Sequence, residues 1–270
     1  MSLAPGQPLD PEVPAELRQE RITGLVQTSG FVRAADLASR FHVSTVTIRS
    51  DLQVLEARGR LRRIRGGAVP VDVARAEQPF EASELDLAAE KAHIGALAAR
   101  QVASGETVLL DVGTTTTAVA RALVARTDLR DVTVFTNALN VALELERAHP
   151  RISVVVTGGT LRPLQHSLVN PLATELLTKL HASIGFVGCN GVDGRAGITN
   201  INLPEAEIKR AMLLAARRRV IVADGSKLGE VELAKVCDLR EVNMVITDHT
   251  ADPAVVAEIK ATGCRVEIAH

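Results

Sequence analysis

The chain has 270 residues, enough for about two domains, and 46% of them are apolar, which supports a core and excludes an intrinsically disordered chain. Aromatic residues make up only 2%, with no Trp and no Tyr, which disfavours proteins that stack bases or sugar rings on aromatic side chains. The three cysteines lie far apart, which indicates neither a disulfide framework nor a zinc knuckle. No cofactor or metal is predicted.

The first 14 residues are polar and rich in proline, and we predict that they form a flexible tail. They lack the basic start and the apolar stretch of a signal peptide. The sequence also contains no run of about 18 apolar residues, so no membrane span is predicted. These features favour a cytoplasmic protein.

Charge is distributed unevenly along the chain. Residues 15–70 hold ten arginines, no lysine and five acids, a net charge of +5, whereas the whole chain has a formal net charge of -1. The tail carries −2, so residues 71–270 carry −4. A basic module joined to an acidic body is typical of a nucleic-acid-binding protein with a separate second function. A solvated basic face is the alternative explanation of the charge alone.

The basic module is predicted to be a winged helix-turn-helix domain. Apolar residues at helical spacing predict helices over 15–27 and 34–41, with a short extended piece between them. Ser44 is a good N-cap for a third helix, which Gly59 ends. The arginine-rich stretch 61–69 is typical of a hairpin. In this fold the third helix enters the major groove of DNA; the alternative is a helical domain whose polar face is merely solvated.

The third helix presents polar residues opposite its apolar face. Arg49 is suited to guanine and Gln53 to adenine, while Ser50 can bond either base and Val46 can meet a thymine methyl group. Thr47 and the arginines of the hairpin are better placed for phosphates. The predicted DNA-binding residues are Ser44, Val46, Thr47, Arg49, Ser50, Gln53, Arg62, Arg63 and Arg65.

These motifs resemble a known signature. Arg18-x3-Ile22-x3-Val26 is followed, after 17 residues, by Ser44-x2-Thr47-Ile48-Arg49-Ser50-Asp51-Leu52, and the hairpin reads Arg-Arg-Ile-Arg-Gly-Gly-Ala. The pattern resembles the DeoR family of bacterial transcription regulators. One departure is Ser50, because the family usually has a basic or amide residue there.

After a polar linker predicted over 71–84, residues 85–270 are predicted to form an α/β domain. A helix over 85–102 is followed by apolar strands that alternate with helices, which predicts a mostly parallel sheet covered by helices. The predicted strands are 107–111, 132–136, 152–157, 184–189, 219–223, 244–247 and 265–268, and the helices lie near 116–125, 138–148, 171–180, 204–216 and 253–262.

Small polar residues follow four of these strands. Asp111-Val-Gly-Thr-Thr opens a helix whose N–H groups suit a phosphate, although it lacks the Gly-Lys-Ser/Thr of a Walker A loop. Thr136-Asn137, the 157–160 stretch and the 188–193 stretch follow the next three strands. Turns favour the same residues, but ligands bind at the carboxyl ends of parallel strands. One shared polar site is therefore predicted.

Three further residues have two explanations each. Glu205 and Lys209 share a helix face, so they contribute either to the site or to an ordinary surface ion pair. Lys227 is either an anion contact or a plain surface lysine. Cys189 is interpreted as a small core residue rather than a nucleophile.

The same stretches resemble the effector domain of the DeoR family, which is related to the ribose-5-phosphate isomerase and CoA-transferase folds. The resemblance covers nearly the whole chain except the first 14 residues and the linker, and it implies a sensor for a phosphorylated sugar or related metabolite. Asn190 stands where the family commonly has Asp, and Asn170 where it has Gly. The predicted effector-binding residues are Asp111, Gly113, Thr114, Thr115, Thr136, Asn137, Gly158, Gly159, Asn190, Glu205, Lys209 and Lys227.

The sequence leaves two functions. The first is a transcription regulator, a repressor of a carbohydrate-utilisation operon, which binds double-stranded operator DNA as a homo-oligomer, a dimer or a tetramer. The second is a sugar-phosphate isomerase-like enzyme with an added DNA-binding module, in which Asp111, Glu205 and Lys209 would be the acid and base groups. The isomerase is expected to have a loop with two carboxylates near the reactive carbon, and few carboxylates stand in the corresponding stretches here. No catalytic residue is therefore predicted.

Overall fold

The computed structural model describes residues 14–29, 31–58, 60–64, 66–69 and 77–270. The chain divides into two compact units, Met1–Glu77 and Gln78–His270, which we describe separately. Most of the predicted tail, Gly59, Arg65 and most of the predicted linker lie outside the described residues. None of the helices in the described ranges combines the length and the apolar character needed to cross a bilayer.

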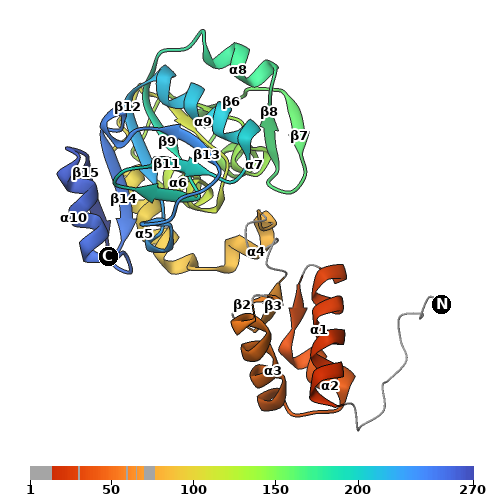
Figure 1. Cartoon of the computed structure of the whole chain (residues 1–270). Coiled ribbons are helices and arrows are strands. Elements are labelled where there is room, and N and C mark those ends of the chain that lie inside the picture. Colours follow the sequence, from red (N-terminus) through yellow and green to blue (C-terminus); the bar gives the residue numbers. More distant parts are fainter. Residues whose placement is uncertain (1–13, 30, 59, 65, 70–76) are drawn as a thin grey trace. The chain divides into compact units, whose positions relative to one another are not determined.

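The first unit is a winged helix-turn-helix, as predicted. Its helices are α1 (Ala15–Ser29), α2 (Ala34–Phe41) and α3 (Thr45–Ala57). Its described strands are β1 (Val32–Arg33), β2 (Arg62–Ile64) and β3 (Gly67–Val69), which form an antiparallel sheet in the order β1-β3-β2 (Figure 1). The core contains apolar residues from all three helices and the hairpin, among them Ile22, Val26, Leu37, Phe41, Ile48, Leu52, Leu55 and Leu61.

A glycine is required where the hairpin meets β1. A Cβ atom on Gly67 would lie 2.1 Å from the carbonyl oxygen of Val32, so any side chain there would separate the two strands. The hairpin sequence Gly66-Gly67 therefore has a packing reason besides its turn geometry.

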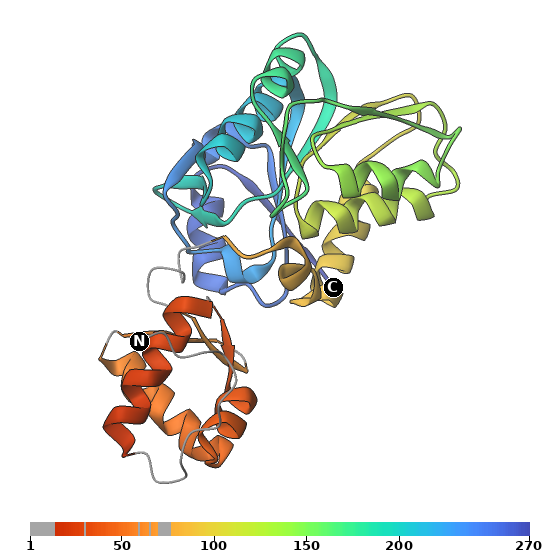
Figure 2. The ribbon, with the colours of Figure 1, turned by 90° about the vertical axis from the view of Figure 1, so that its right-hand side faces the viewer.

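The second unit is built on a parallel sheet, which confirms the predicted α/β class. Within residues 77–270, seven strands pair only in parallel, in the order β15-β14-β12-β9-β4-β5-β6. Figure 2 shows this unit from a second side, in colours that run from yellow to blue along the chain. The order changes direction between β4 and β9, which makes the gap between their carboxyl ends the expected ligand crevice. The strands are β4 (Thr107–Leu110), β5 (Val132–Thr136), β6 (Ile152–Val156), β9 (Ala182–Val187), β12 (Ala216–Val222), β14 (Met244–Asp248) and β15 (Arg265–Ala269).

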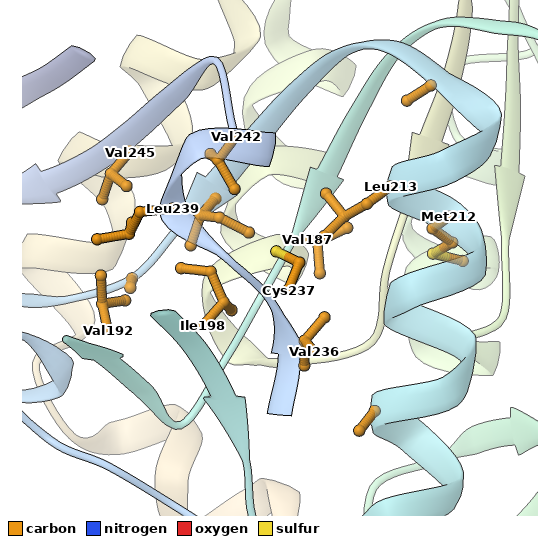
Figure 3. Close-up of a cluster of buried hydrophobic side chains, with 14 of the residues drawn as sticks. Val187, Val192, Ile198, Met212, Leu213, Val236, Cys237, Leu239, Val242 and Val245 are labelled. Atoms are coloured by element: carbon orange, nitrogen blue, oxygen red, sulfur yellow. The ribbon is translucent and has the colours of Figure 1, made fainter. Parts of the chain in front are cut away.

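Helices cover both faces of this sheet. One core packs α5 (Ala88–Ala99), α6 (Thr114–Ala125) and α7 (Leu139–Glu146) against it. The other core packs α8 (Leu172–Leu177), α9 (Leu203–Ala215) and α10 (Pro253–Ala261) against the opposite face. Figure 3 shows part of the second core, where Val187 of β9 lies among Ile198 and side chains of α9. All predicted strands and helices of this unit are confirmed within three residues.

The structure also contains short elements that the sequence does not predict. They are α4 (Phe80–Leu85), the hairpin of β7 (Thr160–Arg162) and β8 (Ser167–Val169), and the sheet of β10 (Gly191–Asp193), β11 (Gly197–Asn200) and β13 (Ala234–Cys237). Elements of three to six residues are too short to show a period, and contacts with distant residues stabilise them. Helix α4 stands where part of a linker was predicted, because the buried Phe80 anchors it to the second unit.

Candidate functional site

The exposed face of α3 carries the residues predicted to read bases. Val46 is 71% exposed, and Arg49, Ser50 and Gln53 are exposed beside it. Ser44 caps the helix, since its hydroxyl accepts a hydrogen bond of 3.0 Å from the backbone N–H of Thr47. The polar face of α3 is therefore exposed, and its contacts with bases stay a prediction.

A buried ion pair orients α3, and sequence reasoning missed it. Arg18 Nε on α1 lies 2.6 Å from Asp51 Oδ2 on α3, and Gln19 Nε2 donates to Asp51 Oδ1 over 2.9 Å. Both charged residues are buried. The two residues belong to the family motif, but they lie 33 positions apart, so spacing alone gave no sign of the pair.

Of the hairpin arginines, the structure places the side chain of Arg63 alone within the described residues. Its Nε lies 2.9 Å from Glu56 Oε2, and its backbone N–H donates to Glu56 Oε1 over 2.7 Å. The hairpin is thereby tied to the end of α3. Arg62 and Arg65 as phosphate contacts stay predictions, since the side chain of Arg62 and the whole of Arg65 lie outside the described part.

Asp111 is the centre of the second candidate site. It follows β4 directly and is fully buried. Its Oδ2 accepts hydrogen bonds from Lys209 Nζ (2.5 Å) and from the backbone N–H of Gly188 after β9 (3.2 Å). Its Oδ1 has no hydrogen-bond partner among the described residues. At the point where the strand order changes direction, the structure thus holds a buried carboxylate with one oxygen that makes no hydrogen bond within the described ranges.

Burial and charge compete at this pair. Burial raises the pKa of Asp111, against the opposing effect of Lys209. Burial by itself would lower the pKa of Lys209, but the carboxylates of Asp111 and Glu205 outweigh it and raise that pKa. Lys209 therefore stays protonated at neutral pH.

Glu205 contacts the β7–β8 hairpin rather than Lys209. The hydroxyl of Ser167 donates to Glu205 Oε1 over 2.5 Å, and Arg162 Nη1 forms a short ion pair with the same oxygen. Glu205 and Lys209 are both buried. The interpretation of these two as an ordinary surface ion pair is therefore wrong. Arg162 and Ser167 are site neighbours that sequence reasoning did not assign, because the hairpin that carries them was not predicted.

Asn137 is buried at the end of β5, beside β4. Its Oδ1 accepts a hydrogen bond from the backbone N–H of Val112 (3.1 Å), and its carbonyl accepts one from Leu168 (2.7 Å). Its Nδ2 finds no acceptor in the ranges that the structure describes. The neighbouring Thr136 hydroxyl caps Ala138 N–H over 3.1 Å, a structural role.

Two glycine-containing turns border the site. Gly113 (φ 137°) precedes α6, where Thr115 is buried and Thr114 is half-buried. Gly158 (φ 75°) and Gly159 (φ 123°) follow β6, and a Cβ on Gly159 would lie 2.1 Å from the carbonyl oxygen of Val169. The first turn leads directly into the N-terminus of α6, and the second is needed for the hairpin to pack.

The remaining predicted residues differ in what they do. Asn190 Oδ1 accepts a hydrogen bond from the backbone N–H of Ile201 over 3.1 Å, so its side chain is used in the fold. Lys227 is half-buried, and its positive charge acts to lower the pKa of Cys189 and of the buried Lys91. Burial raises the pKa of Cys189 to about 12, which agrees with a core residue and not with a nucleophile.

Two family models match the chain. One describes a DeoR-like helix-turn-helix domain and matches residues 18–73, and the other describes the DeoR C terminal sensor domain and matches residues 87–249. The chain belongs to the DeoR family of transcriptional regulators.

Relatives of this DeoR-family regulator are similar over most of their length. The HTH-type transcriptional regulator GlpR of Haloferax volcanii is 36% identical over 256 residues, which cover 94% of this chain and 97% of that protein. The glycerol-3-phosphate regulon repressor of Escherichia coli K12 is 29% identical over 231 residues, which cover 86% and 90%. Among solved structures, ribose 5-phosphate isomerase A from Methanocaldococcus jannaschii aligns with a TM-score of 0.38 and 17% identity over 51% of this chain and 52% of that one.

Proposed function

We propose that the protein is a repressor of a carbohydrate-utilisation operon, controlled by a phosphorylated sugar or polyol that binds around Asp111 and Asn137. One observation carries this proposal. Asp111 Oδ1, an acceptor, and Asn137 Nδ2, a donor, are both buried and unpaired among the described residues, at the ends of adjacent strands. A buried polar atom without a partner costs free energy, and a ligand hydroxyl, which both donates and accepts, satisfies such a pair.

The turn before α6 supports a phosphate on the same ligand. Helix N-termini bind anions through their free N–H groups and their dipole. Helix α6 begins at Thr114, three residues after Asp111. Gly113, Thr114 and Thr115 are thus proposed phosphate contacts, with Lys227 as a cation beyond the end of β12. The name of the E. coli relative refers to a phosphorylated polyol, which agrees with this chemistry.

We propose a binding site rather than a catalytic one. The charged groups that would be acid and base in an isomerase are held in ion pairs, Asp111 with Lys209 and Glu205 with Arg162. A general acid or base needs a pKa near the working pH and a free path to the substrate proton. The raised pKa of Lys209 leaves it a poor base at neutral pH.

A thermal-shift screen of the whole protein tests this function. The panel is glycerol 3-phosphate, ribose 5-phosphate, fructose 6-phosphate, unphosphorylated glycerol and inorganic phosphate. We expect at least one polyol phosphate to raise the melting temperature more than phosphate or glycerol alone. The same compound should change operator affinity in a gel shift by about 5–150-fold, the range of typical allosteric coupling. A compound that is converted at an enzymatic rate and leaves operator binding unchanged would contradict the proposal.

Arg49→Ala is expected to weaken operator binding by about 1–3 kcal/mol and to relax the preference at one base pair, because we propose that the exposed Arg49 side chain reads a guanine. Binding to operators with single base-pair changes measures this effect. Arg40→Ala, an exposed arginine on α2, is the matched control and should change little. Equal weakening on every sequence would instead make Arg49 a phosphate contact.

We also propose that the regulator forms a homodimer through the edge strand β6. The backbone N–H of Val132 donates to the carbonyl of Arg151, and that of Thr157 donates to the carbonyl of Thr136. In residues 151–157, the backbone N–H and C=O groups of the odd-numbered residues therefore point toward β5. The backbone groups of the even-numbered residues then point to the outer edge of the sheet. The backbone N–H of Ile152 fits this pattern, because it donates to the carbonyl of Ala148 and not to β5.

The edge strand is unprotected and self-complementary. β6 carries no charge, whereas β15 at the other edge carries Arg265 and Glu267, and charges are a usual protection of edges. Two copies of β6 that pair antiparallel about Val154 would satisfy both free edges at once, as a two-fold interface requires. Exposed Val156 and Leu143 on the adjoining helix α7 would be covered.

Val156→Lys is expected to convert the dimer to a monomer, since it places a charge within the proposed interface, two residues from the central Val154. Sedimentation velocity measures the change. Val231→Lys, at an exposed valine away from β6, should leave the dimer intact. A wild-type protein that sediments as a monomer, or a Val156→Lys variant that remains dimeric, would rule out this surface.

A further inference from the structure

The segment 78–86 begins the second unit and is bound to the tip of the β7–β8 hairpin. The backbone N–H of Phe80 donates to the carbonyl of Leu164 over 3.0 Å, and Gln165 Nε2 donates to the carbonyl of Gln78 over 2.6 Å. Phe80 is only 5% exposed. The first residues of the unit are thus attached to residues more than 80 positions away in the sequence.

His166 adds two contacts to the same attachment. Its Nε2 lies 2.7 Å from Glu81 Oε1, and its ring meets Phe80 edge-on, with 5.6 Å between ring centroids. The backbone of His166 has φ 56°, and its carbonyl accepts a hydrogen bond of 3.0 Å from Leu139 N–H. This residue is therefore held on both sides, by the 78–86 segment and by the start of α7.

The next two residues of the hairpin lie in the proposed ligand site. Ser167 bonds Glu205, and Leu168 N–H bonds the carbonyl of Asn137. Residues 164–166 thus hold the 78–86 segment, and the next two residues along the chain, 167 and 168, contact the proposed site. A displacement of the hairpin must change both sets of bonds.

The other end of the 78–86 segment is attached to different elements. Lys91 Nζ on α5 donates to the carbonyls of Ser83 (2.6 Å) and Asp86 (2.7 Å). Arg121 on α6 forms an ion pair of 2.6 Å with Glu84. The segment therefore has one half bound to the hairpin and the other half bound to the helical layer, with the change of attachment at about Ala82.

We propose that the β7–β8 hairpin transmits ligand binding to the 78–86 segment, and so to the chain that leads from the DNA-binding unit. A ligand that bonds Asn137, or that displaces Ser167 from Glu205, binds more tightly when the whole hairpin is in one arrangement than in another. Such a difference in affinity is what coupling between ligand binding and operator binding requires. The first half of the segment then moves with the hairpin, while Lys91 and Arg121 hold the second half. This inference rests on the proposed effector site.

The test uses the full-length protein and the ligand from the phosphate panel that most changes operator affinity. Gln165→Ala and His166→Gln each remove a side-chain contact to the segment and none to Glu205 or Asn137. Each variant should bind the ligand within about twofold of wild type and bind operator normally without ligand. The ratio of operator affinities with and without ligand should fall toward 1 from the wild-type value of about 5–150.

Arg121→Ala is the matched control, because it removes an ion pair of the same segment to α6 and none to the hairpin, while the two bonds of Lys91 still hold the second half in place. It should keep the wild-type ratio. If both hairpin variants keep that ratio, or if they lose ligand binding itself, the hairpin is not the transmitter, although the repressor function stands. If no phosphorylated compound changes operator affinity in the wild type, the proposed function fails, and the inference with it.

Discussion

Asp51→Ala is expected to cost the first unit about 3–5 kcal/mol of its free energy of unfolding, because it leaves the buried Arg18 without its carboxylate. Small domains have about 5–15 kcal/mol in total, so the variant should lose most of its operator affinity. It should leave ligand binding by the second unit intact. Urea unfolding and a gel shift measure the two effects.

Two variants make this expectation specific. Asp36→Ala removes an exposed acid of the same unit and should change stability by less than about 0.5 kcal/mol. The double variant Arg18→Met, Asp51→Leu replaces the ion pair by apolar side chains and should recover much of the loss. If Asp51→Ala behaved like Asp36→Ala, the ion pair would not be what holds α3 against α1.

Lys209→Met is expected to destabilise the second unit by about 3–5 kcal/mol at neutral pH and to abolish ligand binding, because Asp111 becomes a buried carboxylate without its cation. The loss should depend on pH. An acid whose pKa is raised in the folded state contributes stability while it is protonated, below its unfolded pKa, and loses it as the pH rises through the folded pKa. The pKa of Asp111 is already raised by burial, and loss of Lys209 raises it further. The penalty should therefore shrink as the solution is acidified.

Free energies of unfolding at several pH values check this result. Lys179→Met removes an exposed lysine that pairs with Glu175 and should show neither the loss nor the change with pH. Asp111→Asn combined with Lys209→Met removes both charges and should be more stable than Lys209→Met alone. A penalty that stays constant with pH would mean that Asp111 does not carry the charge assigned to it.

Most of the fold is readable from the sequence. Mostly apolar runs of four to six residues between helical stretches predict the seven strands of the sheet, and Ser44 followed by the apolar spacing of α3 predicts the third helix. These signals are local, since a period or a cap is complete within one element. The β7–β8 hairpin and α4 have no such signal because they are short and are stabilised by distant contacts.

The sequence alone determined the family, the two kinds of unit and the polar residues that end the strands, because residue type and spacing carry that information. Tertiary structure decided which of those residues meet. Lys209 pairs with Asp111, 98 positions away, rather than with Glu205 one helical turn away. Burial excludes water from such groups, so a buried charge is stable only beside a partner of opposite charge. Which partner lies close enough depends on how whole helices and strands pack.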